Sequence, residues 1–351
     1  MIENKKRNFG FFNMIMTILV VFIMWLMFAG NTYNPDYENF SNIYNTFTRI
    51  GITSYSGVEA GFSFLMRFLG SLGLSYQSFL FVIATIFLTV ITMVTFYFSR
   101  NPFISLLLYI YFPFMLDIVQ IRNSLAYACV LCGLIFLLNE KYLVFTFFVI
   151  LASLFHITSL FYLCFLIIKL DLQKIFRYIV SITLLLIVFR TFFIKYLLGL
   201  LPFGQKYLVY LDGISLFSLL LYIVLIIANI IVNFFIYKRM LILKNKTKIE
   251  RKTIKIALLT LKISVILLLA IPFLSFSSDF FRLYRNMIPL FLFNLTNYFS
   301  IKVYIKRGYS FLVDIITFLL FILTGYYFLY LFEFEHIVLN VFRYNIFFGG
   351  N

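Results

Sequence analysis

Long apolar runs alternate with short polar gaps along the whole chain. A helix needs roughly 17–25 apolar residues to cross the hydrocarbon core of a bilayer. About eleven runs approach that length: 9–30, 76–98, 102–116, 123–139, 142–154, 157–169, 178–194, 214–237, 256–274, 284–300 and 309–332. The pattern predicts an all-α, polytopic integral membrane protein with about eleven transmembrane helices, in a range of roughly nine to thirteen.

That range reflects runs that are shorter than a full span. The runs on either side of His156 could form two helices, one long helix or a hairpin that stops partway across. The segment 58–75 is interrupted by Gly and Arg67, so we expect an interfacial or re-entrant helix with Glu59 at its amino end. No fixed-period repeat or low-complexity linker divides residues 1–351, which predicts a single integral domain.

Composition favours a membrane protein over a nucleic-acid-binding protein. The 351 residues are 63% hydrophobic and 12% charged, so most of the surface must face something other than water. The net charge of +16 lies in short gaps between apolar runs, which argues against a nucleic-acid partner. The start Lys5-Lys6-Arg7 leads into the run 9–30 without a small-residue cleavage pattern, so we expect a retained spanning helix and no cleaved signal.

Basic residues are distributed unevenly between alternate loops. The loops on the side of the amino terminus carry most of the Lys and Arg residues, including the block 238–255, which predicts a cytoplasmic amino terminus. The same alternation assigns polar residues from several separate connections to the outer face: Asp36, Glu59, Asp117, Arg122, His156, Asp279, Arg282 and Arg285. An arginine on that face opposes the insertion bias and should have a local reason, so we expect an outward-facing site.

The segment 116–128, "LDIVQIRNSLAYA", concentrates polar residues within an apolar region. Gln120, Arg122 and Asn123 open a helix, where free backbone N–H groups and the helix dipole favour an anion. This pattern predicts a phosphate-binding site. The alternative is an interfacial cap in which Asp117 pairs with Arg122 across one turn.

A second basic group occurs in "SSDFFRLYRNM". Arg282 and Arg285 are three residues apart and lie on one helix face, and Asp279 extends the same stripe. Two guanidinium groups on one face can bind a diphosphate through paired donors. The alternative is a pair of snorkelling side chains that anchor the helix end beside lipid headgroups.

His156 is the only histidine in the apolar body of the chain, within "ASLFHITSL". An imidazole can accept or donate a proton near neutral pH, as glycosyl transfer requires at the attacking hydroxyl. The alternative is a histidine that is simply hydrogen-bonded to a neighbouring helix.

The segment 31–58 is the longest polar stretch on the expected outer side. It is rich in Tyr and Asn, which suit sugar rings and hydroxyl groups, although an amphipathic surface loop would have a similar composition. Within it, Asp36 is a candidate base or an acceptor for a sugar hydroxyl.

Several enzyme signatures are absent from the sequence. There is no Gly-rich phosphate loop, HExxH, GxSxG or DxD motif, which argues against ATP-driven transport, the common hydrolases and metal-nucleotide glycosyltransferases. Cys129, Cys132 and Cys164 fall within apolar runs without a second pair at metal-ligand spacing, so we interpret them as packing residues. We expect no metal site and no cofactor, which leaves a lipid-linked donor.

These motifs, in this order, resemble the EpsG-like, Wzy-type polymerases of bacterial exopolysaccharide and capsule. The resemblance rests on "NPDYENF", "EAGFSFLMRFLGSLGL", "QIRNSLA" and "LASLFHITSL" between residues 34 and 160, and on "RLYRNM" at 282–287. The positions that keep their places in this pattern are Asp36, Glu59, Gln120, Arg122 and His156.

The resemblance implies a membrane glycosyltransferase of the bacterial plasma membrane, with an outward-facing site. Its substrates would be an undecaprenyl-diphosphate-linked oligosaccharide donor and acceptor, and its partners membrane lipids and the flippase and chain-length regulator of the same pathway. Cations would stabilise the leaving diphosphate, and His156 or Asp36 would take the acceptor proton. The expected substrate-binding residues are Arg122, Gln120, Asn123, Arg282, Arg285, Asp279, Glu59 and Asp117.

Three other functions share parts of this pattern. A polysaccharide ligase would differ in a larger outer loop. A lipid-linked oligosaccharide flippase or transporter would show symmetry between halves and polar residues at the bilayer midplane, neither of which the sequence contains. A membrane O-acetyltransferase would need a cytoplasmic route for its acyl donor, whereas the cytoplasmic loops look like topology signals.

Overall fold

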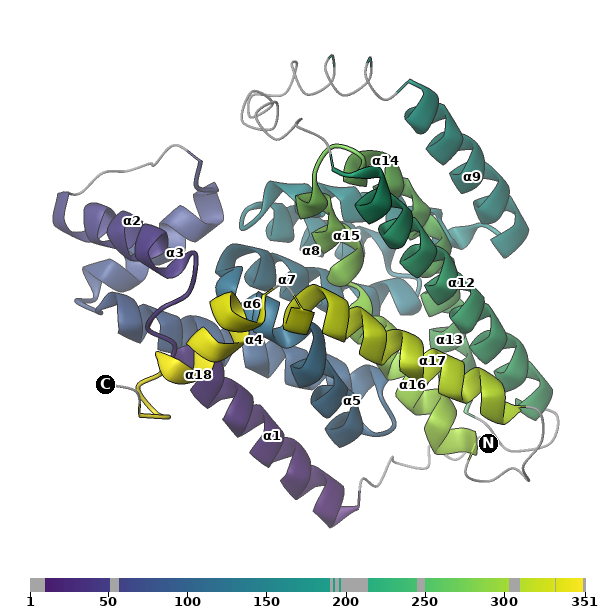
Figure 1. Ribbon diagram of the computed structural model, residues 1–351, viewed down its shortest axis with the longest axis horizontal. Helices are drawn as coiled ribbons and strands as arrows, with labels where there is room; N and C mark the ends of the chain where they lie inside the picture. Colours follow the sequence, from purple (N-terminus) through teal and green to yellow (C-terminus); the bar gives the residue numbers. More distant parts are fainter. Residues whose placement is uncertain are drawn as a thin grey trace. The chain divides into compact units, whose positions relative to one another are not determined.

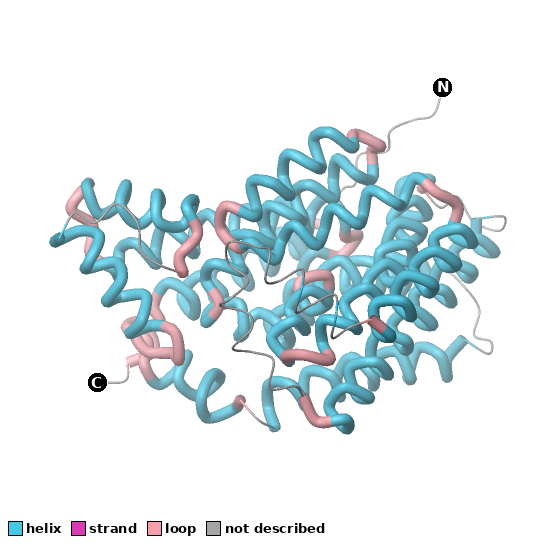
Figure 2. Tube along the Cα trace, turned by 90° about the horizontal axis from the view of Figure 1, so that it is seen from above, coloured by secondary structure: helices cyan, strands magenta, loops and turns pink. Residues whose placement is uncertain are grey.

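The computed structural model describes residues 10–50, 57–189, 192, 196, 214–244, 250–302, 310–331 and 333–349. These residues form helices, and their only β-structure is an isolated bridge between Asn31 and Asn345 (Figure 2). The predicted all-α class is therefore confirmed.

Six helices within the described residues are long and apolar enough to cross a membrane: Phe11–Ala29, Tyr76–Phe98, Pro102–Val119, Ile121–Leu138, Leu216–Ile242 and Arg251–Leu274. A bent pair, Thr317–Leu331 and Phe334–Arg343, gives a seventh if it counts as one span. Several other apolar runs form shorter helices, among them Tyr142–Ser153 and Ile157–Lys169 on either side of His156. The chain is a multi-pass membrane protein, and six or seven of the helices that the structure describes reach spanning length.

The chain divides into two compact units, Met1–Tyr162 with Leu295–Asn351, and Leu163–Asn294. The prediction of a single domain stays a prediction. In the first unit the helices are α1 (Phe11–Ala29), α2 (Tyr37–Ile50), α3 (Ala60–Ser71), α4 (Tyr76–Phe98), α5 (Pro102–Tyr109), η1 (Ile110–Phe114), α6 (Met115–Val119), α7 (Ile121–Leu138), α8 (Tyr142–Ser153), α17 (Ser310–Gly325), η5 (Tyr326–Leu331), η6 (Phe334–Leu339) and α18 (Asn340–Arg343).

The second unit contains α9 (Leu172–Val188), α12 (Leu216–Lys244), α13 (Arg251–Ile266), η3 (Leu267–Ala270), α14 (Ile271–Leu274), η4 (Ser278–Phe280) and α15 (Phe281–Arg285). The unit boundaries fall within η2 (Ile157–Lys169) and α16 (Ile288–Lys302).

The core of the first unit is built from α1, α4, α7 and α8, which pack in that order (Figure 1). Large aromatic side chains such as Phe79 and Phe87 of α4 are completely buried. Gly133 of α7 allows α8 to come close, because a Cβ there would lie 3.1 Å from side-chain atoms of both Phe145 and Phe148. This packing holds the amino end of α7 beside the end of α8.

A group of hydrogen bonds connects the turn between α4 and α5 to α16. The Asn297 side chain accepts from the Arg100 backbone N–H at 2.6 Å and donates to the Phe98 carbonyl at 2.7 Å. Thr296 Oγ1 lies 3.2 Å from the Ser99 hydroxyl and 2.8 Å from that of Ser105. Backbone groups in an apolar bundle need such partners, since no bulk water replaces them.

In the second unit, α12 and α13 lie side by side, and α9 packs on α13 (Figure 1). Lys262, a cation within the α13 span, donates through Nζ to the carbonyls of Ile168 and Leu170 at 2.7 and 2.8 Å. These carbonyls lie at the carboxyl end of η2, where a positive charge is favoured. The ammonium group therefore has a structural role at this position.

Candidate functional site

Three charged or titratable side chains from distant parts of the chain meet in the first unit. Glu59 Oε2 accepts from Arg122 Nη1 at 2.6 Å, and Glu59 Oε1 lies 3.2 Å from His156 Nδ1. The side chains of Arg122, Glu59 and His156 are 22%, 17% and 9% exposed, so the cluster is mostly enclosed but still accessible. All three were predicted as site residues, and the structure places Glu59 in direct contact with the other two.

The start of α3 is fixed against the end of α8. Glu59 has an extended backbone and forms the N-cap of α3. In the first turn of α3, the Gly61 N–H donates to the Leu154 carbonyl at 2.8 Å. A Cβ on Gly61 would lie 2.8 Å from that same carbonyl oxygen, so this approach requires glycine. Because Leu154 is two residues before His156, the contact brings Glu59 to the imidazole.

Arg122 is held at the amino end of α7, where the chain breaks at Gln120 between α6 and α7. Its Nη1 also donates to the Gly57 carbonyl at 3.0 Å, and its guanidinium group lies over the Phe40 ring at 5.1 Å. A guanidinium group that stacks on an aromatic ring and donates hydrogen bonds through its N–H groups is held in one orientation. Arg122 is therefore a preoriented cation at a helix amino end.

Asp36 precedes α2, one helical turn before the Phe40 that stacks on Arg122. Its backbone N–H donates to Asn34 Oδ1 at 2.9 Å, and its side chain is partly exposed. The Asp36 carbonyl accepts from the Phe40 N–H at 3.1 Å, so Asp36 lies at the amino end of the helix whose Phe40 stacks on Arg122.

Asp117 lies inside the bundle, with 1% of the residue exposed. Its Oδ2 accepts from the hydroxyls of Tyr109 at 2.6 Å and Tyr127 at 3.1 Å, and these two hydroxyls also contact each other. The Ser124 hydroxyl donates to the Asp117 carbonyl at 2.7 Å. In the proposed cap, Asp117 would pair with Arg122, but the ion pair that the structure gives Arg122 is with Glu59.

Two further predicted residues flank Arg122. Asn123 is buried, with 3% of the residue exposed, and Gln120 is partly exposed at the break between α6 and α7. The Gln120 carbonyl accepts from the Ser124 hydroxyl at 3.0 Å. Of these two residues, Gln120 is the more exposed.

The predicted arginine pair lies in the second unit. Arg282 Nη2 forms an ion pair with Asp279 Oδ1 at 2.8 Å, and its Nε donates to the Asp279 carbonyl at 2.8 Å. This confirms that Asp279 and Arg282 share one stripe. Arg285 closes α15 and is buried, with 4% of the residue exposed. The two arginines thus differ in accessibility, and Arg282 with Asp279 forms the accessible part.

Electrostatics make Glu59 a permanent anion at neutral pH. Burial opposes its ionisation, but the hydrogen bond with His156 and the charge of Arg122 outweigh burial and lower its pKa to about 2. An ionised carboxylate beside Nδ1 requires the proton on that nitrogen, so the lone pair of the neutral imidazole is on Nε2. A carboxylate-oriented imidazole of this kind can accept a proton from a hydroxyl group.

Sequence reasoning missed the residues that support this arrangement. Tyr109 and Tyr127 hold Asp117, and Phe40 supports Arg122. Phe40 belongs to the quoted motif "NPDYENF", but the chain has 49 Phe and 25 Tyr residues, which leaves no compositional signal for individual aromatic partners. The contact of Gly61 with Leu154 had no signal other than the glycine itself.

Comparison with known protein families gives one match that covers almost the entire chain. Residues 14–346 match the EpsG family. No curated protein matches, and no solved structure matches. The motifs around Asp36, Glu59, Arg122 and His156 all fall within the matched residues. The chain therefore belongs to the EpsG family, a family of Wzy-type polysaccharide polymerases.

Proposed function

We propose that the protein polymerises undecaprenyl-diphosphate-linked oligosaccharide repeat units into exopolysaccharide or capsule. The reaction is a metal-independent glycosyl transfer at the outer leaflet of a bacterial plasma membrane, with the amino terminus in the cytoplasm. Family membership supports polymerisation, and the contact between Glu59, Arg122 and His156 is the observation that carries the mechanism.

The transfer joins a growing glycan to the non-reducing end of a new lipid-linked unit. A hydroxyl oxygen of the acceptor attacks the anomeric carbon of the donor, and its proton passes to His156 Nε2. The bond between the anomeric carbon and the diphosphate breaks, and undecaprenyl diphosphate leaves with the electron pair. Glu59 orients the imidazole through Nδ1 and stabilises the imidazolium that forms, as the ionised carboxylate of a catalytic triad does.

Arg122 stabilises the negative charge that develops on the leaving diphosphate. Its position in the first turn of α7 adds backbone N–H groups and the helix dipole to its own charge. Gln120 and Asn123 flank it, and Asp117 supports the break that presents it. Arg282, paired with Asp279, provides a second phosphate-binding group, and the buried Arg285 lies three residues further along the chain.

Asp36 is the second candidate for the base. It immediately precedes the helix whose Phe40 packs on Arg122, and the residue is partly exposed. We assign His156 the proton transfer and Asp36 the binding of sugar hydroxyls, because the imidazole has an orienting carboxylate in contact. The pathway's flippase supplies the lipid-linked unit, and its chain-length regulator acts on the product; both partners belong to this proposal.

The lipid-linked glycans of variant cells test this function. In cells expressing Arg122→Ala or His156→Ala as the sole copy, long-chain polysaccharide should be lost while one repeat unit remains on its lipid carrier, exposed on the outer side. Arg239→Ala, an exposed arginine of α12, serves as the matched control and should retain long chains. Long chains in the first two variants would reject the site, and a repeat unit confined to the inner leaflet would indicate a flippase.

A further inference from the structure

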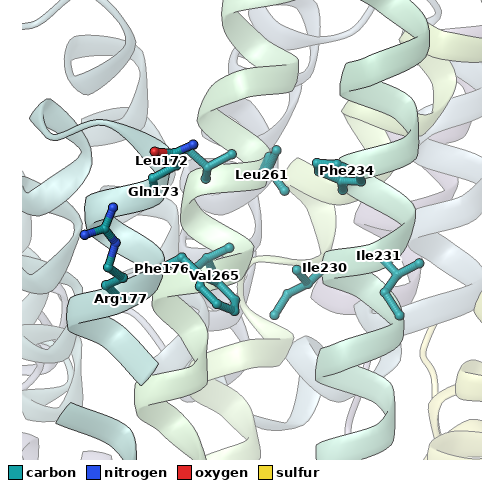
Figure 3. A pocket seen from close by; sticks show the side chains of 9 residues that line it. All are labelled: Leu172, Gln173, Phe176, Arg177, Ile230, Ile231, Phe234, Leu261 and Val265. Atoms are coloured by element: carbon teal, nitrogen blue, oxygen red, sulfur yellow. The ribbon is translucent and has the colours of Figure 1, made fainter. Parts of the chain in front are cut away.

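A groove in the second unit has no role in the proposed reaction. It has a volume of about 540 Å³ and lies between α9 and α12, with α13 as its floor. Figure 3 shows Phe176 of α9 and Ile230 of α12 on either side of Val265. Leu261 completes the floor one turn away, and both floor residues are buried.

The walls of the groove are open to the surroundings of the helix bundle. Phe176 is 52% exposed and Ile231 is 49% exposed, although both are large apolar side chains. A pocket of roughly 300–1,000 Å³ is large enough for a small-molecule ligand. An empty apolar groove of this size would forgo dispersion contacts along its walls, whereas a lipid chain would supply them. In a multi-pass membrane protein, the groove therefore suits a hydrocarbon chain.

Basic side chains flank the groove on both walls. Arg177 of α9 lines it, and Lys238 of α12 places Nζ 5.2 Å from the ring of Phe234, another lining residue. Arg177 and Lys238 are exposed. Lys174 is also on α9 and lies 3.9 Å from Asp171, the acidic residue at that helix end. An apolar groove with cations on opposite walls is complementary to an apolar chain that carries an anionic headgroup.

We propose that this groove binds one anionic glycerophospholipid. One acyl chain lies along Leu261 and Val265 between α9 and α12, and Arg177 and Lys238 bind the phosphate headgroup. This ligand is distinct from the prenyl-linked substrates, and the inference does not depend on the polymerase mechanism. The bound lipid would fill the gap between α9 and α12 and stabilise the second unit.

Native mass spectrometry of the purified full-length protein tests this site with dioleoyl-phosphatidylglycerol as the probe. Dioleoyl-phosphatidylcholine carries the same chains without the net charge and should bind more weakly. Ile231→Trp fills the groove from its exposed wall and should abolish the preferential binding. Arg177→Gln and Lys238→Gln should each weaken phosphatidylglycerol binding by about fivefold, because a basic side chain near an anionic headgroup contributes about that factor.

Matched controls separate the groove from the rest of the helix surface. Phe147→Trp alters an exposed apolar residue of α8 in the first unit, and Arg239→Gln removes a basic residue next to Lys238. Both controls should leave binding unchanged. As a second measurement, photo-crosslinking from benzoylphenylalanine at position 230 in wild-type background should capture phospholipid, and the same probe at position 147 should capture far less.

Three results would overturn the proposal. The first is equal binding of the two phospholipids to the wild-type protein, and the second is unchanged binding in Ile231→Trp. The third combines two observations: an equimolar amount of undecaprenyl phosphate displaces phosphatidylglycerol from the wild-type protein, and Ile231→Trp fails to bind undecaprenyl phosphate. That result would assign the groove to the prenyl carrier. If Ile231→Trp does not fold, crosslinking at positions 230 and 147 decides between the outcomes, and equal capture rejects the site.

Discussion

Glu59 and Arg122 are 63 residues apart in the chain, yet Glu59 Oε2 lies 2.6 Å from Arg122 Nη1. The second oxygen of the same carboxylate reaches His156, so one acidic side chain fixes the position of a cation and of an imidazole. Glycosyl transfer to a hydroxyl needs a proton acceptor and a group that stabilises the leaving diphosphate. The ion pair therefore connects the two functions that the proposed mechanism assigns to separate residues.

His156→Asn should abolish proton transfer and preserve the local contact. The asparagine amide can still donate to Glu59, but it cannot accept a proton from a sugar hydroxyl at neutral pH. We expect polymerisation of a purified lipid-linked repeat unit to slow by about 10²-fold or more, with normal protein yield. A rate within twofold of the wild type would remove His156 from the reaction and favour Asp36.

Arg122→Lys should reduce activity although the charge is retained. A lysine ammonium cannot reproduce the planar stacking on Phe40 together with the bonds to Gly57 and Glu59. We expect a loss of about 10-fold or more in kcat/KM for the lipid-linked donor. Arg239→Lys on α12 is the conservative control and should have no effect. Equal activity of Arg122→Lys and the wild type would show that only the charge matters.

Acidic pH should weaken the cluster through Glu59. Its pKa is lowered from 4.5 to about 2, so its stabilising contribution is complete above about pH 4.5 and is lost as the pH falls towards 2. We expect the thermal unfolding midpoint in detergent to fall more steeply between pH 5 and pH 3 in the wild type than in Glu59→Gln. Parallel pH profiles for the two proteins would contradict the lowered pKa.

Gly61→Ala should disturb the contact between α3 and α8. The added methyl group would lie 2.8 Å from the Leu154 carbonyl oxygen, which is part of the backbone and cannot rotate away. The expected cost is about 1–3 kcal/mol in the free energy of unfolding, with a loss of activity because Glu59 moves relative to His156. Gly10→Ala is the control, since its added Cβ meets nothing within 4 Å. Thermal unfolding and polymerisation assays would report both effects.

Tyr127→Phe should destabilise the break between α6 and α7, which places Arg122 in the first turn of α7. The change removes one donor to the buried Asp117 carboxylate, and the expected cost is about 1–3 kcal/mol in the free energy of unfolding. Tyr178→Phe, at an exposed position on α9, should be neutral in the same thermal unfolding assay. If the two variants are equally stable, the tyrosine contacts of Asp117 do not support the break.

The helical class could be predicted from the sequence because long apolar runs dictate helices in a membrane. The positions at which the helices end could not be predicted, because they depend on packing. The two apolar runs on either side of His156 form separate helices of 12 and 13 residues, with a break between Ser153 and Ile157. Nothing in the hydropathy of that region separates a full span from two short helices.

The candidate site could be predicted as a set of residue types, but not as a set of contacts. Glu59, Arg122 and His156 stand out because ionisable side chains are rare in such a chain. Which of them meet depends on the packing of α3 against α8, and that is set by Gly61 and Leu154. Asp117 stands out for the same reason, but its contacts with the tyrosines of α5 and α7 could not be inferred from the sequence.

The hydrogen bond between Arg100 and Asn297 joins positions that are 197 residues apart. A ribosome adds roughly 5–20 residues per second, so about ten seconds or more separate the synthesis of these two partners. Until then the turn after α4 must rely on water, lipid headgroups or the insertion machinery for its hydrogen bonds. The turn after α4 therefore lacks its hydrogen-bond partner until α16 has been synthesised. A nascent chain that stops before Leu295 would leave the Arg100 backbone N–H without Asn297, and we expect quality-control proteases to degrade such a chain.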